Sequence, residues 1–211
     1  MSDPEGLLAA GGDLSVARLL GAYERGIFPW YAAGQPILWW APDPRMVLFP
    51  DEFHLSRSLR RTLRARLFET RLDQAFARTI RACAAPRRAG TETWLNAAMI
   101  GAYEELFRQG YAHSVETYAG GELVGGLYGV QLGRVFFGES MWSGRADASK
   151  VALARLVEEC RLRGIHLIDC QVASAHLAAF GARELPRRDF SALLRNYARR
   201  APRGAWASAA A

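Results

Sequence analysis

Apolar residues recur every three to four positions in several stretches of the chain, a spacing typical of amphipathic helices. The first of these helices is expected after Ser15, a favourable N-cap residue, and ends at Gly26. It carries Leu19, Leu20 and Tyr23 on one face. Further helices are expected at 56–65, 73–84, 93–109 with Thr93 as cap, 147–163, and a short one from Ser174.

Other stretches alternate apolar and polar residues, the period of a strand with one buried face. These predicted strands are 46–49, 67–72, 112–119, 122–131, 134–142 and 166–172. Only short glycine-containing turns separate the three strands between 112 and 142, which indicates an antiparallel meander. The order of the elements therefore predicts an α+β fold, a mixed sheet flanked by helices.

Residues 27–45 interrupt this regularity, because proline and aromatic side chains dominate the segment. We expect an ordered loop or a surface that presents rings to a ligand. A boundary near Asp43 would divide the chain into a small N-terminal lobe, 1–43, and a larger lobe, 44–211, whose last residues, 200–211, are expected to form a poorly ordered tail.

Composition narrows the class of protein. Of the 211 residues, 50% are hydrophobic and 23% charged, so the chain is globular rather than disordered, and no apolar run reaches the roughly 20 residues that span a bilayer. We therefore expect a soluble, cytoplasmic protein without a membrane partner. Cys83, Cys160 and Cys170 show neither disulfide nor zinc spacing, and the four histidines are not paired as metal ligands.

The predicted strand 166–172 carries a candidate for chemistry. Its two-residue period places Leu167, Asp169 and Gln171 on one face, so the last two side chains are neighbours roughly 7 Å apart. An aspartate among apolar residues is costly unless it is paired, hydrogen-bonded or used. Asp169 is therefore either part of a functional site or a cap on a loop at the end of the strand.

Glu139 raises the same question in the strand 134–142. The period places it on a face with Val135, Phe137 and Met141, among large apolar side chains. It is either an exposed glutamate without a role or a carboxylate in a substrate cleft, able to hold a cationic group.

The basic residues are almost all arginine, since Lys150 is the single lysine among 27, and the net charge is +6. In the helix 56–65, Arg57, Arg60, Arg61 and Arg64 form one cationic stripe at helical spacing. Like charges at this spacing repel, which favours a polyanion as partner; a solvated helix face is the alternative.

The chain as a whole resembles the bacterial leucyl/phenylalanyl-tRNA–protein transferases. The resemblance runs from about residue 6 to 194 and rests on these blocks in the family's order: GGDLSVARLLGAYERGIFPW, ILWWAPDPR, FHLSRSL, AHSVE, ELVGGLYGV, FFGESMWS, ASKVAL, LIDCQV and LPRRDF. It implies that the larger lobe has the GNAT-like fold of the N-acetyltransferases, without a metal, coenzyme A or other cofactor. The chain reads GRADASK where an acetyl-CoA-binding relative has its pyrophosphate turn.

The resemblance also implies the reaction. Leucine or phenylalanine, less readily methionine, moves from aminoacyl-tRNA to the N-terminal amine of proteins that begin with Arg or Lys, which marks them for N-end-rule degradation. A monomer is expected. The rival hypotheses are a coenzyme A-dependent N-acetyltransferase and a non-catalytic RNA-binding module.

The family's site residues carry over by position. Asp169 and Gln171 match the catalytic pair, Glu139 the cleft glutamate, and Trp30 and Trp94 the aromatic residues that hold the terminal adenosine. The pocket for the donor side chain corresponds to Leu127, Phe136, Met141, Ser143, Leu156, Cys160 and Ile168. Leu156 and Cys160 replace phenylalanines, so the leucine-to-phenylalanine preference is open. As a separate departure, Ser174 replaces an asparagine. The arginine stripe is expected to hold the tRNA backbone.

Overall fold

The computed structural model describes residues 6–85, 93–199 and 206, which form two sheets and the helices around them. The smaller sheet has the order β1-β3-β2, with β1 at Leu7–Ala10, β2 at Phe28–Pro29 and β3 at Leu38–Trp40. The larger sheet has the order β10-β4-β9-β8-β7-β6-β5. Its strands are β4 Arg45–Leu48, β5 Glu69–Leu72, β6 Ala112–Ala119, β7 Glu122–Leu132, β8 Val135–Ser143, β9 Leu167–Gln171 and β10 Arg183–Leu185.

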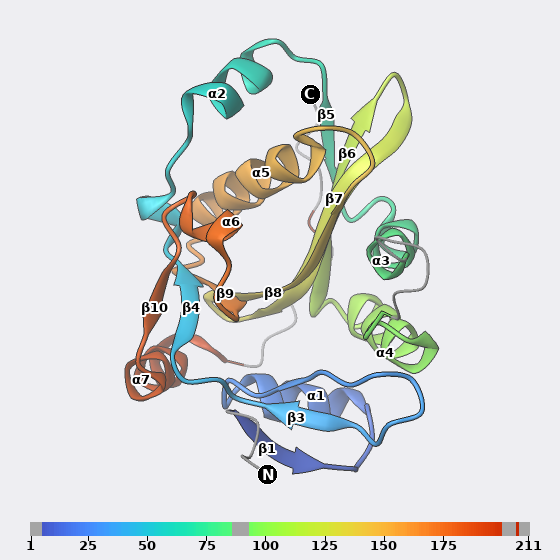
Figure 1. Ribbon diagram of the computed structural model, residues 1–211, viewed down its shortest axis with the longest axis vertical. Coiled ribbons are helices and arrows are strands. Elements are labelled where there is room, and N and C mark those ends of the chain that lie inside the picture. The colour runs from blue at the N-terminus through green and yellow to red at the C-terminus, as the bar shows by residue number, and fades with distance from the viewer. Residues whose placement is uncertain (1–5, 86–92, 200–205, 207–211) are drawn as a thin grey trace.

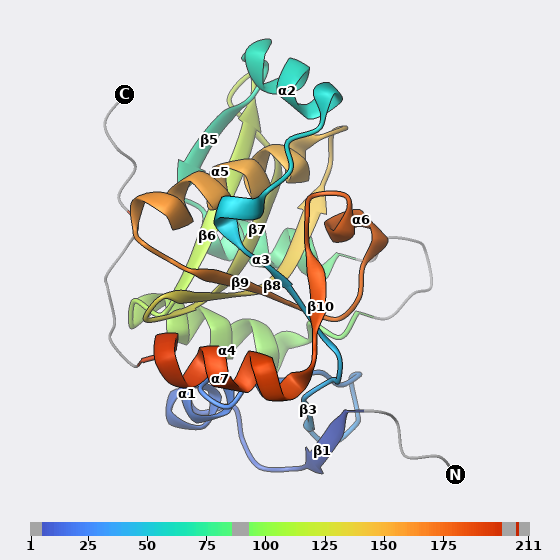
Figure 2. The ribbon, with the colours of Figure 1, turned by 90° about the vertical axis from the view of Figure 1, so that its left-hand side faces the viewer.

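Helices cover both faces of the larger sheet. They are α1 Val16–Tyr23, α2 Arg57–Arg64, α3 Phe76–Ala84, α4 Ala97–Arg108, α5 Ala148–Leu162, α6 Ala175–Ala178 and α7 Arg187–Tyr197, with a 3-10 turn at Pro50–Glu52. Figure 1 shows α5 on one side of β6 and β7 and α3 and α4 on the other, with α1 and the smaller sheet below. Figure 2 views the molecule from the side of α7, which lies in front of α1 and α4, and Figure 1 shows that α7 and α4 lie on opposite sides of the molecule. The predicted α+β class, a mixed sheet flanked by helices, is confirmed.

Two apolar clusters form the core, one on each face of the sheet. The first joins α1, α3, α4 and α7 through residues such as Leu19, Ile80 and Leu194; the second joins α5 to the sheet through residues such as Leu127 and Phe136. Successive side chains of β7 and β8 point to opposite faces of the sheet, so these strands contribute apolar residues to both clusters. No helix of the described ranges is long and apolar enough to cross a membrane.

One pairing positions the site. All neighbouring strands of the larger sheet are antiparallel except β8 and β9, which run parallel and pair only from Val135↔Leu167 to Phe137↔Asp169. Beyond the last pair the two strands continue without further backbone pairing to each other. Glu139 on β8 and Gln171 on β9 lie just past this point.

Several expected boundaries differ from the structure. The helix expected at 93–109 begins at Ala97, and its N-cap is Asn96, whose side chain accepts from the Met99 N–H at 3.1 Å. The segment 27–45, expected to lack regular structure, contributes β2, β3 and the start of β4. β1, β10 and α7 were not anticipated, because three- and four-residue strands are too short to show a period and α7 lies in a charged stretch.

The C-terminal expectation fails at one position. Trp206 lies within the expected disordered tail, yet its side chain is completely buried. The remainder of that prediction, 200–205 and 207–211, lies outside the described residues.

Candidate active site

Two adjoining cavities open where β8 and β9 separate. The larger, about 440 Å³, lies over β7, β8 and β9 and is bounded by α5 and α6; the smaller, about 130 Å³, is bounded by the segment with Phe28, Pro29 and Trp30. Trp94, Glu139, Gln171 and Val172 line both. The two cavities therefore meet at one carboxyl and one amide side chain.

A β-bulge turns Glu139 into this junction. Gly129 pairs with Gly138 and Tyr128 with Ser140, so Glu139 is the unpaired extra residue of β8. The bulge also reverses the faces beyond it. Glu139 points toward the face of α1 and α4, whereas Met141 packs in the cluster under α5, so the expectation that the two share a face is wrong.

Two tyrosine hydroxyls hold the Glu139 carboxyl. The Tyr23 hydroxyl donates to Oε1 and the Tyr103 hydroxyl to Oε2, each at 2.7 Å, and the two hydroxyl oxygens are 2.6 Å apart. All three contacts can be hydrogen bonds at the same time only in the neutral form of Glu139, in which the carboxyl proton is donated to one tyrosine oxygen and the hydroxyl of that tyrosine donates to the other.

Burial supports the same protonation state. It raises the pKa of Glu139 to about 7, and the nearby charge of Asp169 acts in the same direction, although the hydroxyls of Tyr103 and Tyr23 lower that pKa. Burial, followed by the Glu139 charge, raises the pKa of both tyrosines well above their ordinary value. Glu139 can therefore exchange a proton near neutral pH, which suits a general acid–base group.

Asp169 borders the larger cavity beside this junction and is completely buried. Its oxygens accept from the Arg45 guanidinium, Nε to Oδ1 at 2.8 Å and Nη2 to Oδ2 at 2.7 Å, and Oδ1 also accepts from the Gln171 N–H at 2.9 Å. Arg45 packs between the rings of Phe28 and Phe190, each 4.8 Å away. The carboxylate is thus bonded to protein groups on both oxygens.

Gln171 has a strained backbone, with φ at +65°. Its side-chain Nε2 donates to Glu139 Oε1 at 3.0 Å, and its N–H is the one bonded to Asp169. The left-handed conformation and these two bonds link the predicted pair and the predicted cleft glutamate into one network. The three residues expected to act together lie together.

The predicted donor pocket is only partly assembled. Five of its seven residues line the larger cavity: Leu127, Phe136, Met141, Leu156 and Ile168. Ser143 instead donates its hydroxyl to the Arg145 carbonyl at 2.7 Å, and Cys160 is a buried residue of α5; neither is among the described residues that line the cavity. Ser174 caps α6 by accepting from the Leu177 N–H at 3.4 Å, at the rim of the same cavity.

The two predicted aromatic residues border the smaller cavity. Trp30 is 42% exposed and lies 6.0 Å from the ring of Trp40, and Trp94 is half-buried where the two cavities adjoin. An exposed tryptophan at a cavity mouth offers a stacking surface for a planar ring.

The arginine stripe lies on α2, which Figure 1 shows far from α6, β8 and β9 and which contributes no described lining residue to either cavity. Arg57, Arg60, Arg61 and Arg64 are exposed, and within the described chain none of them forms an ion pair with a carboxylate. Leu59 fixes the other face of the helix in the core.

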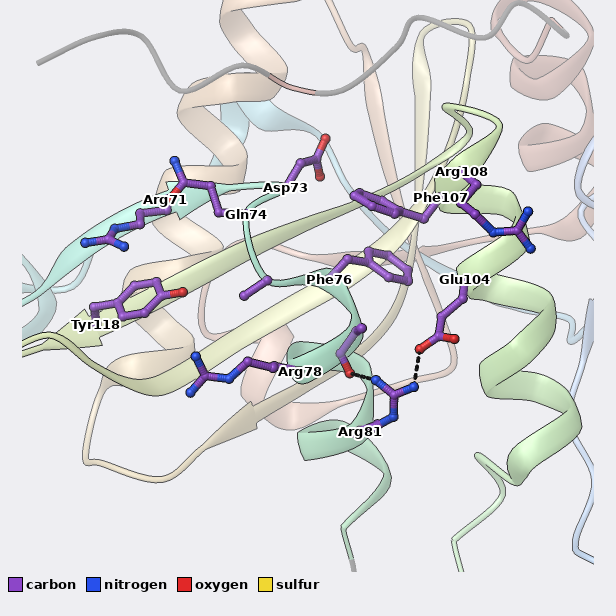
Figure 3. A pocket seen from close by; sticks show the side chains of 12 residues that line it. Arg71, Asp73, Gln74, Phe76, Arg78, Arg81, Glu104, Phe107, Arg108 and Tyr118 are labelled. Atoms are coloured by element: carbon purple, nitrogen blue, oxygen red, sulfur yellow. Dashed lines mark hydrogen bonds and ion pairs between the residues drawn. The ribbon is translucent and has the colours of Figure 1, made fainter.

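A third hollow, about 560 Å³, lies between β5, α3 and α4 and shares no lining residue with the other two. Figure 3 shows Phe76 and Phe107 side by side, their rings stacked, and Arg81 bonded to Glu104. Two further lining arginines, Arg71 and Arg108, are also paired with glutamates of the chain. Arg78 also lines the hollow and forms no ion pair within the described ranges, and neither Glu139 nor Gln171 borders this hollow.

Sequence reasoning missed Arg45, Tyr23 and Tyr103. Tyr23 and Tyr103 have the signals of helix core residues, and Arg45 is one arginine among many. One feature of the sequence distinguishes Arg45 from the other arginines. It stands at the start of an apolar strand, where burying a guanidinium without a partner would be costly.

The sequence of this chain is similar to the sequences of known proteins. The family models described as leucyl/phenylalanyl-tRNA protein transferase and its N-terminal domain match residues 47–195 and 12–43. Curated proteins named leucyl/phenylalanyl-tRNA–protein transferase are 57% identical in Aromatoleum aromaticum, over 96% of this chain and 85% of that protein, and 58% identical in Thiobacillus denitrificans, over 91% and 84%.

Another protein of that name, from Laribacter hongkongensis, is 52% identical over 98% of this chain and 89% of its own. A solved ribosomal-protein-alanine N-acetyltransferase from Brucella melitensis is 14% identical, with a TM-score of 0.39 over 68% of this chain and 96% of that one. The sequence relatives and the two family models show that this chain belongs to the leucyl/phenylalanyl-tRNA–protein transferase family and is an aminoacyl-tRNA–protein transferase.

Proposed function

We propose that the protein transfers leucine or phenylalanine, less readily methionine, from aminoacyl-tRNA to the N-terminal α-amine of proteins that begin with Arg or Lys, marking them for N-end-rule degradation. The observation that carries the proposal is the position of Glu139, whose carboxyl joins an apolar cavity to a cavity edged by tryptophans. The apolar cavity suits a leucyl or phenylalanyl side chain. Trp30 and Trp94 suit the terminal adenosine.

The donor ester is already activated, so the reaction needs orientation and the movement of one proton. The amine nitrogen attacks the ester carbonyl carbon, and the bond from that carbon to the ribose oxygen breaks. Glu139 in its ionised form takes the amine proton, and in its neutral form returns it to the departing ribose oxygen. A pKa of about 7 allows both steps.

Gln171 orients the reactants and Asp169 positions Gln171. Complete burial of Asp169 and its bonds to Arg45 support an indirect role for this carboxylate, through the Gln171 N–H, over direct contact with the amine. Asp169 thus holds the strained Gln171 backbone so that its amide faces the junction.

Charged side chains attract both substrates, Glu139 the acceptor protein and the arginine stripe the tRNA. Glu139 in its ionised form attracts a cationic N-terminal residue. The arginine stripe attracts the phosphates of the tRNA stem, without reading its sequence.

The test is transfer of labelled leucine or phenylalanine from its tRNA to three peptides that differ only in the first residue, Arg, Lys or Ala. We expect product with Arg and Lys and little with Ala. Equal rates for the Ala peptide would contradict the acceptor assignment. Thermal stabilisation by acetyl-CoA, together with acetyl transfer, would favour the acetyltransferase instead.

A further inference from the structure

Trp206 occupies an enclosed position behind the larger cavity. Its side chain is completely buried in the apolar cluster between α5 and the sheet, where Leu127, Phe136 and Leu156 also lie. These three residues line the cavity, and Trp206 is not among its described lining residues. Trp206 therefore lies one layer behind the cavity wall.

The indole is fixed by contacts on several sides. Its Nε1–H donates to Gln131 Oε1 at 3.0 Å, and its ring stacks on His113 with centroids 4.5 Å apart and planes 10° apart. Its backbone N–H donates to Asp73, which also bonds His113 Nδ1 at 2.8 Å. The Arg163 guanidinium lies 5.1 Å from the ring centroid. This set of contacts holds one ring in one orientation.

Phe136 connects this ring to the cavity. Its ring centroid is 5.5 Å from that of Trp206. On another side, the ring lies so near Gly129 that a Cβ built there would be 2.6 Å from Phe136 Cε1. Phe136 can shift toward neither neighbour while both are present, and it is completely buried. Trp206 thus limits how far this part of the cavity wall can retreat.

We propose that Trp206 is a specificity-positioning residue, which sets the depth of the donor side-chain cavity by packing behind Phe136. The proposal rests on the proposed function, in which this cavity holds the donor side chain. Removing the indole leaves a void, and neighbouring side chains relax into such voids in part. Phe136 would then retreat, so the deeper cavity would fit phenylalanine as well as before and leucine less well.

The experiment measures kcat/KM for leucyl-tRNA and phenylalanyl-tRNA with one Arg-initial peptide, for the unaltered protein and for Trp206→Ala. We expect the phenylalanine-to-leucine ratio to rise about tenfold, the scale of a one-methylene misfit in an apolar pocket. Both rates are taken on the same preparation, so a loss of folded enzyme cancels from the ratio. A general loss of stability would leave the ratio unchanged.

Two further variants separate specificity from stability. Trp206→Phe keeps a smaller ring, should fold if Trp206→Ala does not, and should move the ratio part of the way. Leu194→Ala truncates a residue that is 1% exposed in the other core cluster and should keep the ratio within about twofold of the unaltered protein, as for any void remote from the cavity.

A double variant tests the route through Phe136. In a Phe136→Leu background, Trp206→Ala should change the ratio much less than in the unaltered protein, since coupled residues are not additive. An unchanged ratio in both Trp206→Ala and Trp206→Phe would overturn the proposal. So would an equal effect in the Phe136→Leu background. Absence of transfer by the unaltered protein would instead refute the proposed function.

Discussion

Arg45 and Asp169, 124 positions apart in the sequence, form a bidentate ion pair in the interior. The distances are 2.8 Å from Nε to Oδ1 and 2.7 Å from Nη2 to Oδ2. Their side chains are 1% and 0% exposed. The pair lies beside the Glu139–Gln171 junction and joins β4 to β9. A buried pair of this kind is costly to break, because the remaining charge has no solvent to compensate it.

Arg45→Met should therefore lower the free energy of unfolding by about 3–5 kcal/mol, since it leaves Asp169 unpaired in the interior. Arg45→Lys, which keeps the charge but loses the bidentate geometry, should lie between this variant and the unaltered protein. Urea unfolding measures both. Arg18→Met, which breaks the exposed pair with Asp13, is the control and should change stability by less than about 1 kcal/mol. Similar losses for Arg45→Met and Arg18→Met would refute the argument.

Glu139 should make stability depend on pH. Its pKa rises from 4.5 in the unfolded chain to about 7 in the folded protein, so the folded state binds the extra proton between these values. The resulting stabilisation is complete below pH 4.5 and is lost as the pH rises through 7, about 3 kcal/mol in all. Relative to Glu139→Gln, the unaltered protein should gain stability as the pH falls from 8 to 5. Parallel curves for the two proteins in urea unfolding would contradict the raised pKa.

Tyr103→Phe should raise the pKa of Glu139 further, because the Tyr103 hydroxyl donates to the carboxyl and favours its charged form. The acidic limb of the pH–rate profile for transfer should then move to higher pH. Tyr128→Phe is a matched control: the Tyr128 hydroxyl is buried nearby and has no hydrogen-bond partner in the described chain. A shift of the same size in both variants, or a shift of Tyr103→Phe to lower pH, would count against the ring of hydroxyls.

Reversal of Arg60 and Arg64 to Glu tests the arginine stripe. Phosphate contacts carry no sequence information, so KM for leucyl-tRNA and phenylalanyl-tRNA should rise by similar factors. The log–log slope of tRNA affinity against salt should flatten by up to about one unit per arginine removed. Transfer from an aminoacyl-adenosine, too short to reach α2, should be almost unchanged. If the short donor loses as much activity as full tRNA, the stripe is a solvated helix face.

Local patterns in the sequence were sufficient for most elements of the larger sheet. The meander of β6, β7 and β8 and the helix α5 follow from period and glycine turns, because these elements are long enough to repeat their pattern. The sequence blocks around Asp169 and Glu139 also identified the family, because the family model matches the chain over the range that contains them. The helix α2 and its arginine stripe follow from spacing alone.

The tertiary structure alone decided what those side chains contact. A one-residue bulge in β8 separates Glu139 from Met141, and no strand period reveals an extra residue. The partners of Glu139 and Asp169 come from distant segments, Tyr23, Tyr103 and Arg45, and pairing across such distances leaves no local pattern. Trp206 is the extreme case. The tail around it has a composition typical of disordered segments, yet its indole is completely buried. Burial depends on the apolar surroundings that a side chain reaches in the fold and not on its neighbours in sequence.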